Sequence, residues 1–191
     1  MGASKNGAIV AAYRLASRSF THRKIKFNTN SKTAHVVSLL GQDTEVLRNS
    51  LITYPCLQVV NKISVLIANG SHLKNIYKKT IAGLPPVKAF TQVLSELGPE
   101  NDVYKTPRIV GLASKKNHVL GIVSNRNLIV RSFPFKPGLA YYVATYRKTD
   151  PSNNVLMDFN AINAREAAET VHERYIFKTF THPLMYNCFF Y

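Results

Sequence analysis

Tryptophan is absent from this 191-residue chain, and cysteine occurs only twice, at Cys56 and Cys188. Two cysteines indicate neither a disulfide framework nor a structural zinc site. No apolar run approaches the roughly eighteen residues that a membrane-spanning helix needs. The N-terminal stretch Met1–Asn6 also lacks the long apolar segment of a secretory signal. We therefore expect a cytoplasmic protein that has no membrane partner, binds no metal and needs no cofactor.

Acidic residues are scarce as well. The chain has 10 Asp and Glu against 25 Lys and Arg, and its formal net charge is +15. No acid comes before Asp43, between Glu45 and Glu96, or between Asp102 and Asp150. Such long basic stretches favour a phosphorylated substrate or a polyanion such as nucleic acid. The alternative is a basic surface that serves only solubility.

Apolar sequence, in contrast, is abundant enough for a core. Hydrophobic residues make up 46% of the chain, and we expect a single domain over residues 1–191. Apolar patterning predicts strands at 7–14, 33–40, 51–60, 62–68, 109–113, 119–123, 128–130 and 139–146, and helices at 71–82, 85–97 and 164–175. This order indicates an α+β protein with two antiparallel sheets flanked by helices.

Two local features stand out from this pattern. Pro55 lies inside the strand predicted at 51–60, so we expect an edge, a bulge or a bend there, with Tyr54 turned out of the regular pleat. The apolar residues Phe189, Phe190 and Tyr191 follow at the end of the sequence. We expect them to form a small sticky patch that packs at a subunit contact.

The segment Asn69-Gly70-Ser71-His72 joins a predicted strand to a predicted helix. Asn and Gly tolerate the positive φ of a sharp turn, and Ser71 is a favoured helix N-cap. A glycine turn before a helix N-terminus presents free backbone N–H groups, which bind anions well. The alternative is an ordinary capped turn without a ligand.

Two further groups of polar residues are candidates for chemistry. Arg14, Arg18 and Arg23 are interleaved with serine and threonine hydroxyls, a combination that suits phosphate oxygens; the alternative is a solvated loop. Glu100 and Asp102 precede Arg108, and paired carboxylates beside an arginine can divide the acid and base roles. For these acids the alternative is a loop that ends the helix in solvent.

Five short motifs occur in order along the chain. They are Val10-Ala11-Ala12-Tyr13-Arg14, Ser17-Arg18-Ser19-Phe20 followed by Arg23, Asn69-Gly70-Ser71-His72, Thr106-Pro107-Arg108-Ile109 and Phe180-Thr181-His182-Pro183. Their order and spacing resemble the archaeal-type IMP cyclohydrolase family over roughly residues 7–183. Each motif alone is weak, but five in order are specific.

The resemblance implies a fold, an assembly and a reaction. The implied fold is a four-layer α-β-β-α sandwich of the N-terminal-nucleophile hydrolase type. The implied assembly is a homo-oligomer, specifically a tetramer. The reaction closes 5-formamidoimidazole-4-carboxamide ribotide to IMP with loss of water, the last step of purine biosynthesis. Because nothing is oxidised or reduced, no cofactor is expected. Amide hydrolysis by an N-terminal nucleophile is not expected, because no Ser, Thr or Cys is available at the N-terminus.

The resemblance also implies roles for single residues. The site must hold a 5′-phosphate, orient two groups of one molecule and move protons. We expect Tyr54, Glu100 and Asp102 to share hydrogen bonding and proton transfer, with Arg108 orienting a carboxylate. Substrate binding is expected from Arg14, Arg18, Arg23, Asn69, Gly70, Ser71, His72 and Thr106, with the arginines on the phosphate.

Two other functions stay open at this point. One is a family member without catalysis that acts as a basic nucleic-acid-binding or structural subunit, which predicts steeply salt-dependent binding to RNA or DNA. The other is a purine-nucleotide-binding protein without turnover. Cyclohydrolase activity would exclude both.

Overall fold

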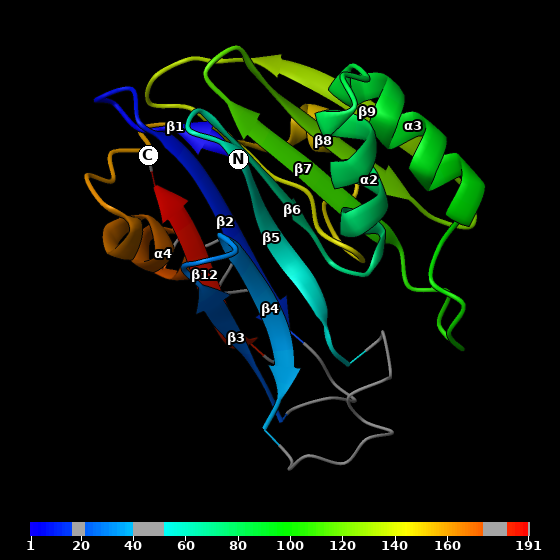
Figure 1. Ribbon diagram of the computed structural model, residues 1–191. Coiled ribbons are helices and arrows are strands. Elements are labelled where there is room, and N and C mark those ends of the chain that lie inside the picture. Colours follow the sequence, from blue (N-terminus) through cyan, green and yellow to red (C-terminus); the bar gives the residue numbers. More distant parts are fainter. Residues whose placement is uncertain (17–21, 40–51, 174–182, 191) are drawn as a thin grey trace.

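The computed structural model describes residues 1–16, 22–39, 52–173 and 183–190 (Figure 1). Its larger sheet has seven antiparallel strands in the order β3-β4-β5-β6-β7-β8-β9, so that each strand pairs with the next one along the chain. These strands are β3 (Arg23–Asn28), β4 (Thr33–Ser38), β5 (Tyr54–Asn61), β6 (Ser64–Ala68), β7 (Arg108–Ser114), β8 (Asn117–Val123) and β9 (Leu128–Pro134).

The smaller sheet has five antiparallel strands in the order β11-β10-β1-β2-β12. It is built from distant parts of the chain: β1 (Gly2–Ala3), β2 (Ile9–Ala16), β10 (Ala140–Tyr141), β11 (Val155–Leu156) and β12 (Pro183–Phe190). A short 3-10 helix, η1 (Pro151–Asn153), precedes β11. The long pair in this sheet is β2 with β12, in which Val10 lies opposite Phe190.

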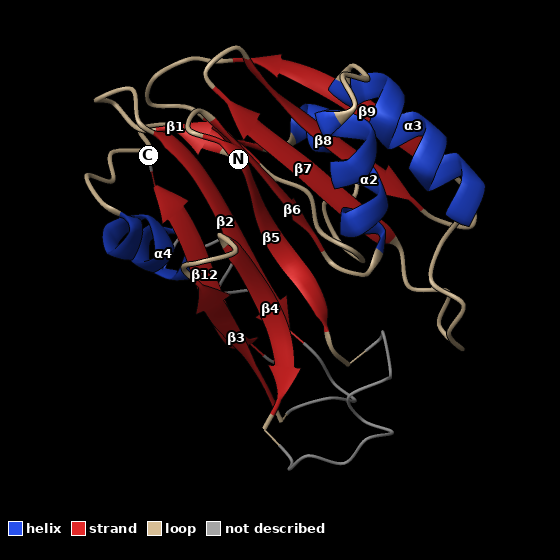
Figure 2. Ribbon diagram, viewed as in Figure 1, coloured by secondary structure: helices blue, strands red, loops and turns tan. Residues whose placement is uncertain are grey.

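Apolar side chains join these sheets and three helices into four layers. Helices α2 (His72–Ile81) and α3 (Pro86–Leu97) cover the outer face of the seven-stranded sheet, and Ile76 and Phe90 are fully buried against it. Helix α4 (Ala164–Glu173) packs on β2 and β12. A third cluster fills the space between the sheets, with Leu57 of one sheet and Ile9 of the other. Figure 2 shows the helices on the two outer sides.

The α+β class and the sandwich of two antiparallel sheets flanked by helices are thereby confirmed. All three predicted helices and the strand hairpin before α2 lie where the sequence predicts them. The strand predicted at 139–146 is only two residues long, at Ala140–Tyr141. No helix in the described ranges is long and apolar enough to cross a membrane.

Four strands are missing from the sequence prediction, and two of them, β1 and β11, are only two residues long. Strand β3 starts where the arginine-rich segment ends, and no element was predicted for its later residues, although its alternation of basic and apolar residues is that of a strand. Strand β12 contains Phe189 and Phe190 of the expected sticky end, which pair with Ala11 and Val10 of β2, and the subunit contact stays a prediction. Tyr191 and the part of the helix predicted beyond Glu173 lie outside the described residues.

A β-bulge interrupts the pairing of β4 with β5. Ala34 pairs with Leu57, but His35 pairs with Pro55, which leaves the intervening cysteine as an extra residue on β5. Strand β5 is not at the edge of its sheet, so the bulge is the correct one of the three outcomes predicted for Pro55. The extra residue changes the alternation, and Tyr54 enters the cluster between the sheets together with Leu57.

Candidate active site

Several candidate residues lie at one end of the seven-stranded sheet. Arg23, Tyr54 and Arg108 are the first residues of β3, β5 and β7, and Asn69 directly follows β6. Because neighbouring strands run in opposite directions, the starts of β3, β5 and β7 lie at the same end of the sheet as the end of β6. We call this end, with these four residues, the polar end.

A buried ion pair joins Arg108 to Glu100 at the polar end. The Nη1 group of Arg108 donates a hydrogen bond to Oε1 of Glu100, and its Nε donates to the Gly98 carbonyl at 3.0 Å. Each of the two charged side chains is only 10% exposed. Gly98 ends α3 with a φ of 60°, a conformation that glycine adopts without strain. The turn after α3 therefore carries Glu100 back to the start of β7.

Two opposing effects act on the Glu100 carboxyl. Burial raises the pKa of Glu100, whereas the neighbouring Arg108 guanidinium lowers it, and the net pKa is raised. The nearby Asp102 charge adds to the increase. A carboxyl in this setting gains and loses its proton closer to neutral pH than an ordinary glutamate does, which suits acid–base chemistry.

Asp102 closes the loop that follows Glu100. Its Oδ1 accepts a hydrogen bond from the Thr106 amide at 2.8 Å, and its Oδ2 accepts one from Thr106 Oγ1 at 2.6 Å. Burial acts to raise the pKa of Asp102, but the hydrogen bonds outweigh it and the pKa lies below its ordinary value. An ionised carboxylate only accepts, so the Tyr146 hydroxyl is the donor in its 3.1 Å contact with Thr106 Oγ1.

Asn69 and His72 both hold the backbone at the start of β7. Asn69 Nδ2 donates to the Pro107 carbonyl at 2.9 Å, and its Oδ1 accepts from the Ile109 amide at 2.7 Å. His72 Nε2 lies 3.0 Å from the Ile109 carbonyl. Burial lowers the pKa of His72 to about 4, so its ring is neutral at physiological pH. Both side chains fasten the segment that carries Arg108.

The start of α2 is tighter than the sequence pattern suggests. Ser71 is the N-cap residue as predicted, but its side chain makes no capping hydrogen bond to a described residue. Its backbone is already helical, with φ −61° and ψ −19°. The amides of Leu73 and Lys74 donate to the carbonyls of Gly70 and Ser71. These two amides are therefore engaged within the turn and do not face an anion.

A second polar cluster lies on the other face of the sheet, between the sheets. The hydroxyls of Tyr13 on β2 and Tyr54 on β5 are 2.9 Å apart, and each tyrosine is 7% exposed. Arg23 also hydrogen-bonds Tyr54. Burial raises the pKa of Tyr54 in spite of Tyr13 and Arg23, which favour its charged form. Burial likewise raises the pKa of Tyr13, so both phenols are neutral.

The two predicted phosphate-binding arginines that the structure describes, Arg14 and Arg23, are not gathered in one place. Side chains alternate along a strand, and on β2 Tyr13 faces the larger sheet while Val10 and Ala12 pack on the α4 side. Arg14 therefore faces the α4 side, where burial lowers its pKa. Arg23 begins β3 at the polar end, and Arg18 lies outside the described residues.

The arrangement can move a proton at Glu100 and can donate hydrogen bonds from arginine, tyrosine and threonine side chains. Among the described residues, no group of three or more His, Cys, Asp or Glu side chains is placed to hold a metal ion. Cys56 is buried, and burial raises the pKa of its thiol to about 12, so it is an unreactive core residue.

Comparison with known proteins connects this geometry to a family. A family model described as IMP cyclohydrolase-like protein matches residues 1–190. The chain belongs to the IMP cyclohydrolase-like family. It is 36% identical to a protein named IMP cyclohydrolase from Methanosphaera stadtmanae, over 96% of this chain and 87% of that one. Proteins of the same name from Methanocaldococcus jannaschii, over 96% and 87%, and Halobacterium salinarum, over 87% and 80%, are 30% and 35% identical.

In this member of the IMP cyclohydrolase-like family, two residues of the polar clusters were not predicted from the sequence. Tyr13 lies inside the motif Val10–Arg14 but was not predicted as a site residue. Strand alternation could have indicated it, because Tyr13 and Arg14 point to opposite faces of the same strand. Tyr146 reaches Thr106 across 40 residues. Nothing in the neighbourhood of Tyr146 in the sequence indicates this contact.

Proposed function

We propose that the chain closes 5-formamidoimidazole-4-carboxamide ribotide to IMP with release of water. The observation that carries the proposal is the buried Glu100–Arg108 pair at the polar end, in a chain that matches the IMP cyclohydrolase-like family over nearly all its length. The relatives that bear this name are 30–37% identical to the chain.

The reaction sets two tasks for the site. The carboxamide nitrogen bonds to the formyl carbon, and the carbon–oxygen bond of the formyl group then breaks. The released water takes the formyl oxygen, one proton from the carboxamide nitrogen and one from the formamide nitrogen. The protein must therefore accept a proton from nitrogen, deliver one to oxygen and hold the reacting atoms together.

Glu100 is the residue best suited to the proton transfers. Its carboxyl has a raised pKa, and Arg108 fixes its orientation through a direct hydrogen bond. Asp102 anchors Thr106 beside it, and Thr106 and Tyr146 supply hydroxyls at the same loop. Tyr54 supplies a further hydroxyl on the opposite face of the sheet end, where it is hydrogen-bonded to Tyr13. Asn69, Gly70 and His72 shape the turn against which the substrate is held.

A spectrophotometric assay of IMP formation tests the proposal. We expect turnover by the unmodified protein, and a loss of about 100-fold or more in kcat for Glu100→Gln. Glu169→Gln is the matched control, because Glu169 pairs with Arg165 on the exposed surface of α4. Full activity of a folded Glu100→Gln protein would contradict the assignment, and inactivity of the unmodified protein would contradict the function.

Of Arg14 and Arg23, the two predicted phosphate-binding arginines that the structure describes, we expect Arg23 to contribute more to phosphate binding. It stands at the polar end, whereas Arg14 faces α4. Loss of one charge-assisted hydrogen-bond fork should raise KM by about tenfold in Arg23→Lys. We expect a smaller effect in Arg14→Lys, and Arg18 keeps its predicted role. An unchanged KM in Arg23→Lys would remove Arg23 from the phosphate site.

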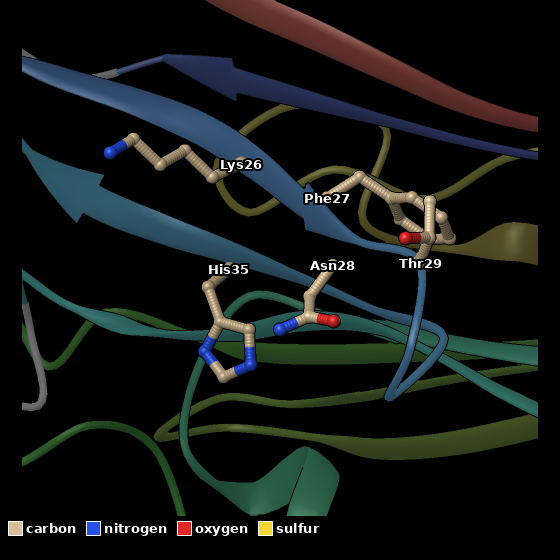
Figure 3. Close-up of a pocket in the computed structure, with 5 residues that line it drawn as sticks. All are labelled: Lys26, Phe27, Asn28, Thr29 and His35. Carbon is tan, nitrogen blue, oxygen red and sulfur yellow. The ribbon is translucent and has the colours of Figure 1, made fainter.

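A second function is favoured by one further observation. No strand of the seven-stranded sheet contains an acidic residue, and neither does α2. On the uncovered face of β3 and β4, Lys26 lies opposite His35. Both line a hollow of about 450 Å³ with Phe27, Asn28 and Thr29, away from the Glu100–Arg108 pair. Figure 3 shows Asn28 and His35 pointing to the same side of the hairpin.

This surface has the chemistry that binds single-stranded nucleic acid. Lysines contact phosphates, and an aromatic ring such as the imidazole of His35 can stack on a base. Fluorescence anisotropy with a labelled RNA oligonucleotide, read against salt, measures the interaction. Lys26→Ala should reduce the salt slope by about one unit, while the exposed Lys136→Ala serves as control. Equal slopes would exclude this surface.

The homo-oligomer, its tetrameric form and the cytoplasmic location expected from the sequence stay predictions. Sedimentation of the purified protein tests the first two, since a monomer at assay concentration would exclude them.

A further inference from the structure

His72 and Glu100 face each other across a residue that has no side chain. A Cβ atom added to Gly70 would lie 2.6 Å from Glu100 Oε1 and 3.1 Å from His72 Nδ1. The imidazole and the carboxyl therefore border the same small space beside the Gly70 Cα. Gly70 itself is buried, and so are the other two residues. Substitution of Gly70 by alanine would fill this space and push on the carboxyl.

The hydrogen bond at Nε2 fixes the tautomer of His72. The Ile109 carbonyl can only accept, so Nε2 carries the proton in its 3.0 Å contact. In a neutral ring Nδ1 is then an acceptor. Nδ1 is fully buried and has no hydrogen-bond partner among the described residues. Buried acceptors are nearly always paired in folded proteins, so this one indicates a donor that arrives in another state of the site.

Glu100 is the group that can supply this donor. While it is ionised, the carboxylate accepts from Arg108, and Arg108 can only donate. Once it is protonated, its O–H needs an acceptor that Arg108 cannot provide. The charged or titratable groups around it are Arg108 on β7, Asp102 on the following loop and His72 on α2. Asp102 has both oxygens engaged by Thr106, which leaves Nδ1 of His72.

We propose that His72 is a positioning residue for Glu100. When the carboxyl of Glu100 is protonated, its O–H donates a hydrogen bond to Nδ1 of His72 beside Gly70. When the carboxyl is ionised, it accepts a hydrogen bond from Arg108. The two partners thus give the carboxyl a hydrogen bond in each protonation state. His72 does not take the proton itself, because burial keeps its pKa at about 4. The inference rests on the proposed function only in that Glu100 moves a proton during ring closure.

The substitution His72→Gln separates the two bonds of the ring. The glutamine amide reaches the position of Nε2 and keeps the donor to Ile109, but it places no acceptor at the position of Nδ1. Removing a hydrogen bond to the neutral form of a carboxyl lowers its pKa. Carbon-13 NMR titration of the Glu100 carboxyl without substrate should therefore show a fall of about one pH unit in His72→Gln.

His118→Gln is the matched control. His118 is also a buried histidine whose pKa burial lowers, but it lies on β8 beside Phe135 and Tyr141, far along the sheet from Arg108. The Glu100 titration should be unchanged in this variant. An unchanged Glu100 titration in folded His72→Gln, or an equal shift in His118→Gln, would overturn the proposal.

Kinetics give a second readout if the proposed function holds. His72→Gln should lower kcat by about tenfold with KM within about twofold, and the limb of the pH profile assigned to Glu100 should move to lower pH. Gly70→Ala should give the same direction of change, because its Cβ displaces the carboxyl. A rise in KM alone would place His72 on the substrate instead and contradict the positioning role. Absence of turnover in the unmodified protein leaves the NMR titration as the deciding measurement.

Discussion

The two faces of the polar end are both buried, but one holds an ion pair and the other holds a pair of neutral phenols. On the helix side, Glu100 and Arg108 form an ion pair with side chains 10% exposed. On the side between the sheets, Tyr13 and Tyr54 are 7% exposed and share a hydrogen bond between neutral phenols. The difference teaches that burial does not by itself remove charge. The Glu100 carboxyl is held in its charged form by the Arg108 guanidinium, whereas burial keeps the two phenols neutral although Arg23 hydrogen-bonds Tyr54.

Arg108→Ala breaks the charged face and should have the largest effect. It leaves the Glu100 carboxyl buried without its counter-charge, and removal of one member of a buried pair costs about 3–5 kcal/mol in the free energy of unfolding. Urea denaturation at pH 7 measures this loss. Glu100→Gln combined with Arg108→Met should recover part of it, because neither remaining side chain is then charged. A loss below about 1 kcal/mol would show that water compensates the carboxylate.

Acid tests whether the space between the sheets tolerates a charge. Burial, with a smaller contribution from the N-terminal amine, lowers the pKa of His118 from 6.5 to about 3. The unfolded chain therefore binds this proton first, so stability is complete above about pH 6.5 and falls as the pH drops toward 3. The loss between pH 7 and pH 5 should be about 2 kcal/mol smaller in His118→Leu. Equal losses in both proteins would exclude His118 as the cause.

Tyr13→Phe sharpens the comparison on the phenolic face. It removes one hydroxyl from the 2.9 Å contact, while Tyr54 keeps its hydrogen bond with Arg23. One neutral hydrogen bond contributes about 1 kcal/mol to the free energy of unfolding, and we expect a loss of that size in urea denaturation. An effect as large as that of Arg108→Ala would mean that the phenols carry charge after all.

Arg165→Ala removes an ion pair that lies in water, and we expect it to have the smallest effect. Arg165 Nε lies 2.9 Å from Glu169 Oε1 on α4, but its side chain is 89% exposed. Solvent screens the pair, so thermal unfolding should show almost no change in Tm. A clear fall in Tm would remove burial as the reason for the difference between the two ion pairs.

The fold could be predicted from the sequence where structure is local. Helical spacing and turn residues located α2, α3 and α4, and the strand hairpin before α2 followed from its apolar runs. Strand β3 was missed because its arginine-rich approach resembled a phosphate-binding loop. Strand β12 was missed because a final strand is recognised only with its partner, and β2 is almost the length of the chain away.

The site could be predicted in part for the same reason. Glu100 and Arg108 are eight residues apart, and the sequence suggested their association before the structure placed them in contact. The Tyr13–Tyr54 pair spans 41 residues and depends on a bulge that moves Tyr54 between the sheets. Pro55 announced an irregularity but not its direction. The gap at Gly70 needs coordinates, because the sequence does not show what a missing side chain would touch.

The pairing of β2 with β12 has a consequence for how the protein is made. β2 emerges early from the ribosome, but one of its edges has no partner until β12 has been synthesised. An open strand edge templates contacts with other chains, and pairings between such distant segments form slowly. Until β12 is made, the nascent chain therefore carries an edge open to aggregation. Slower synthesis should lengthen this exposure and increase aggregation of the newly made chain.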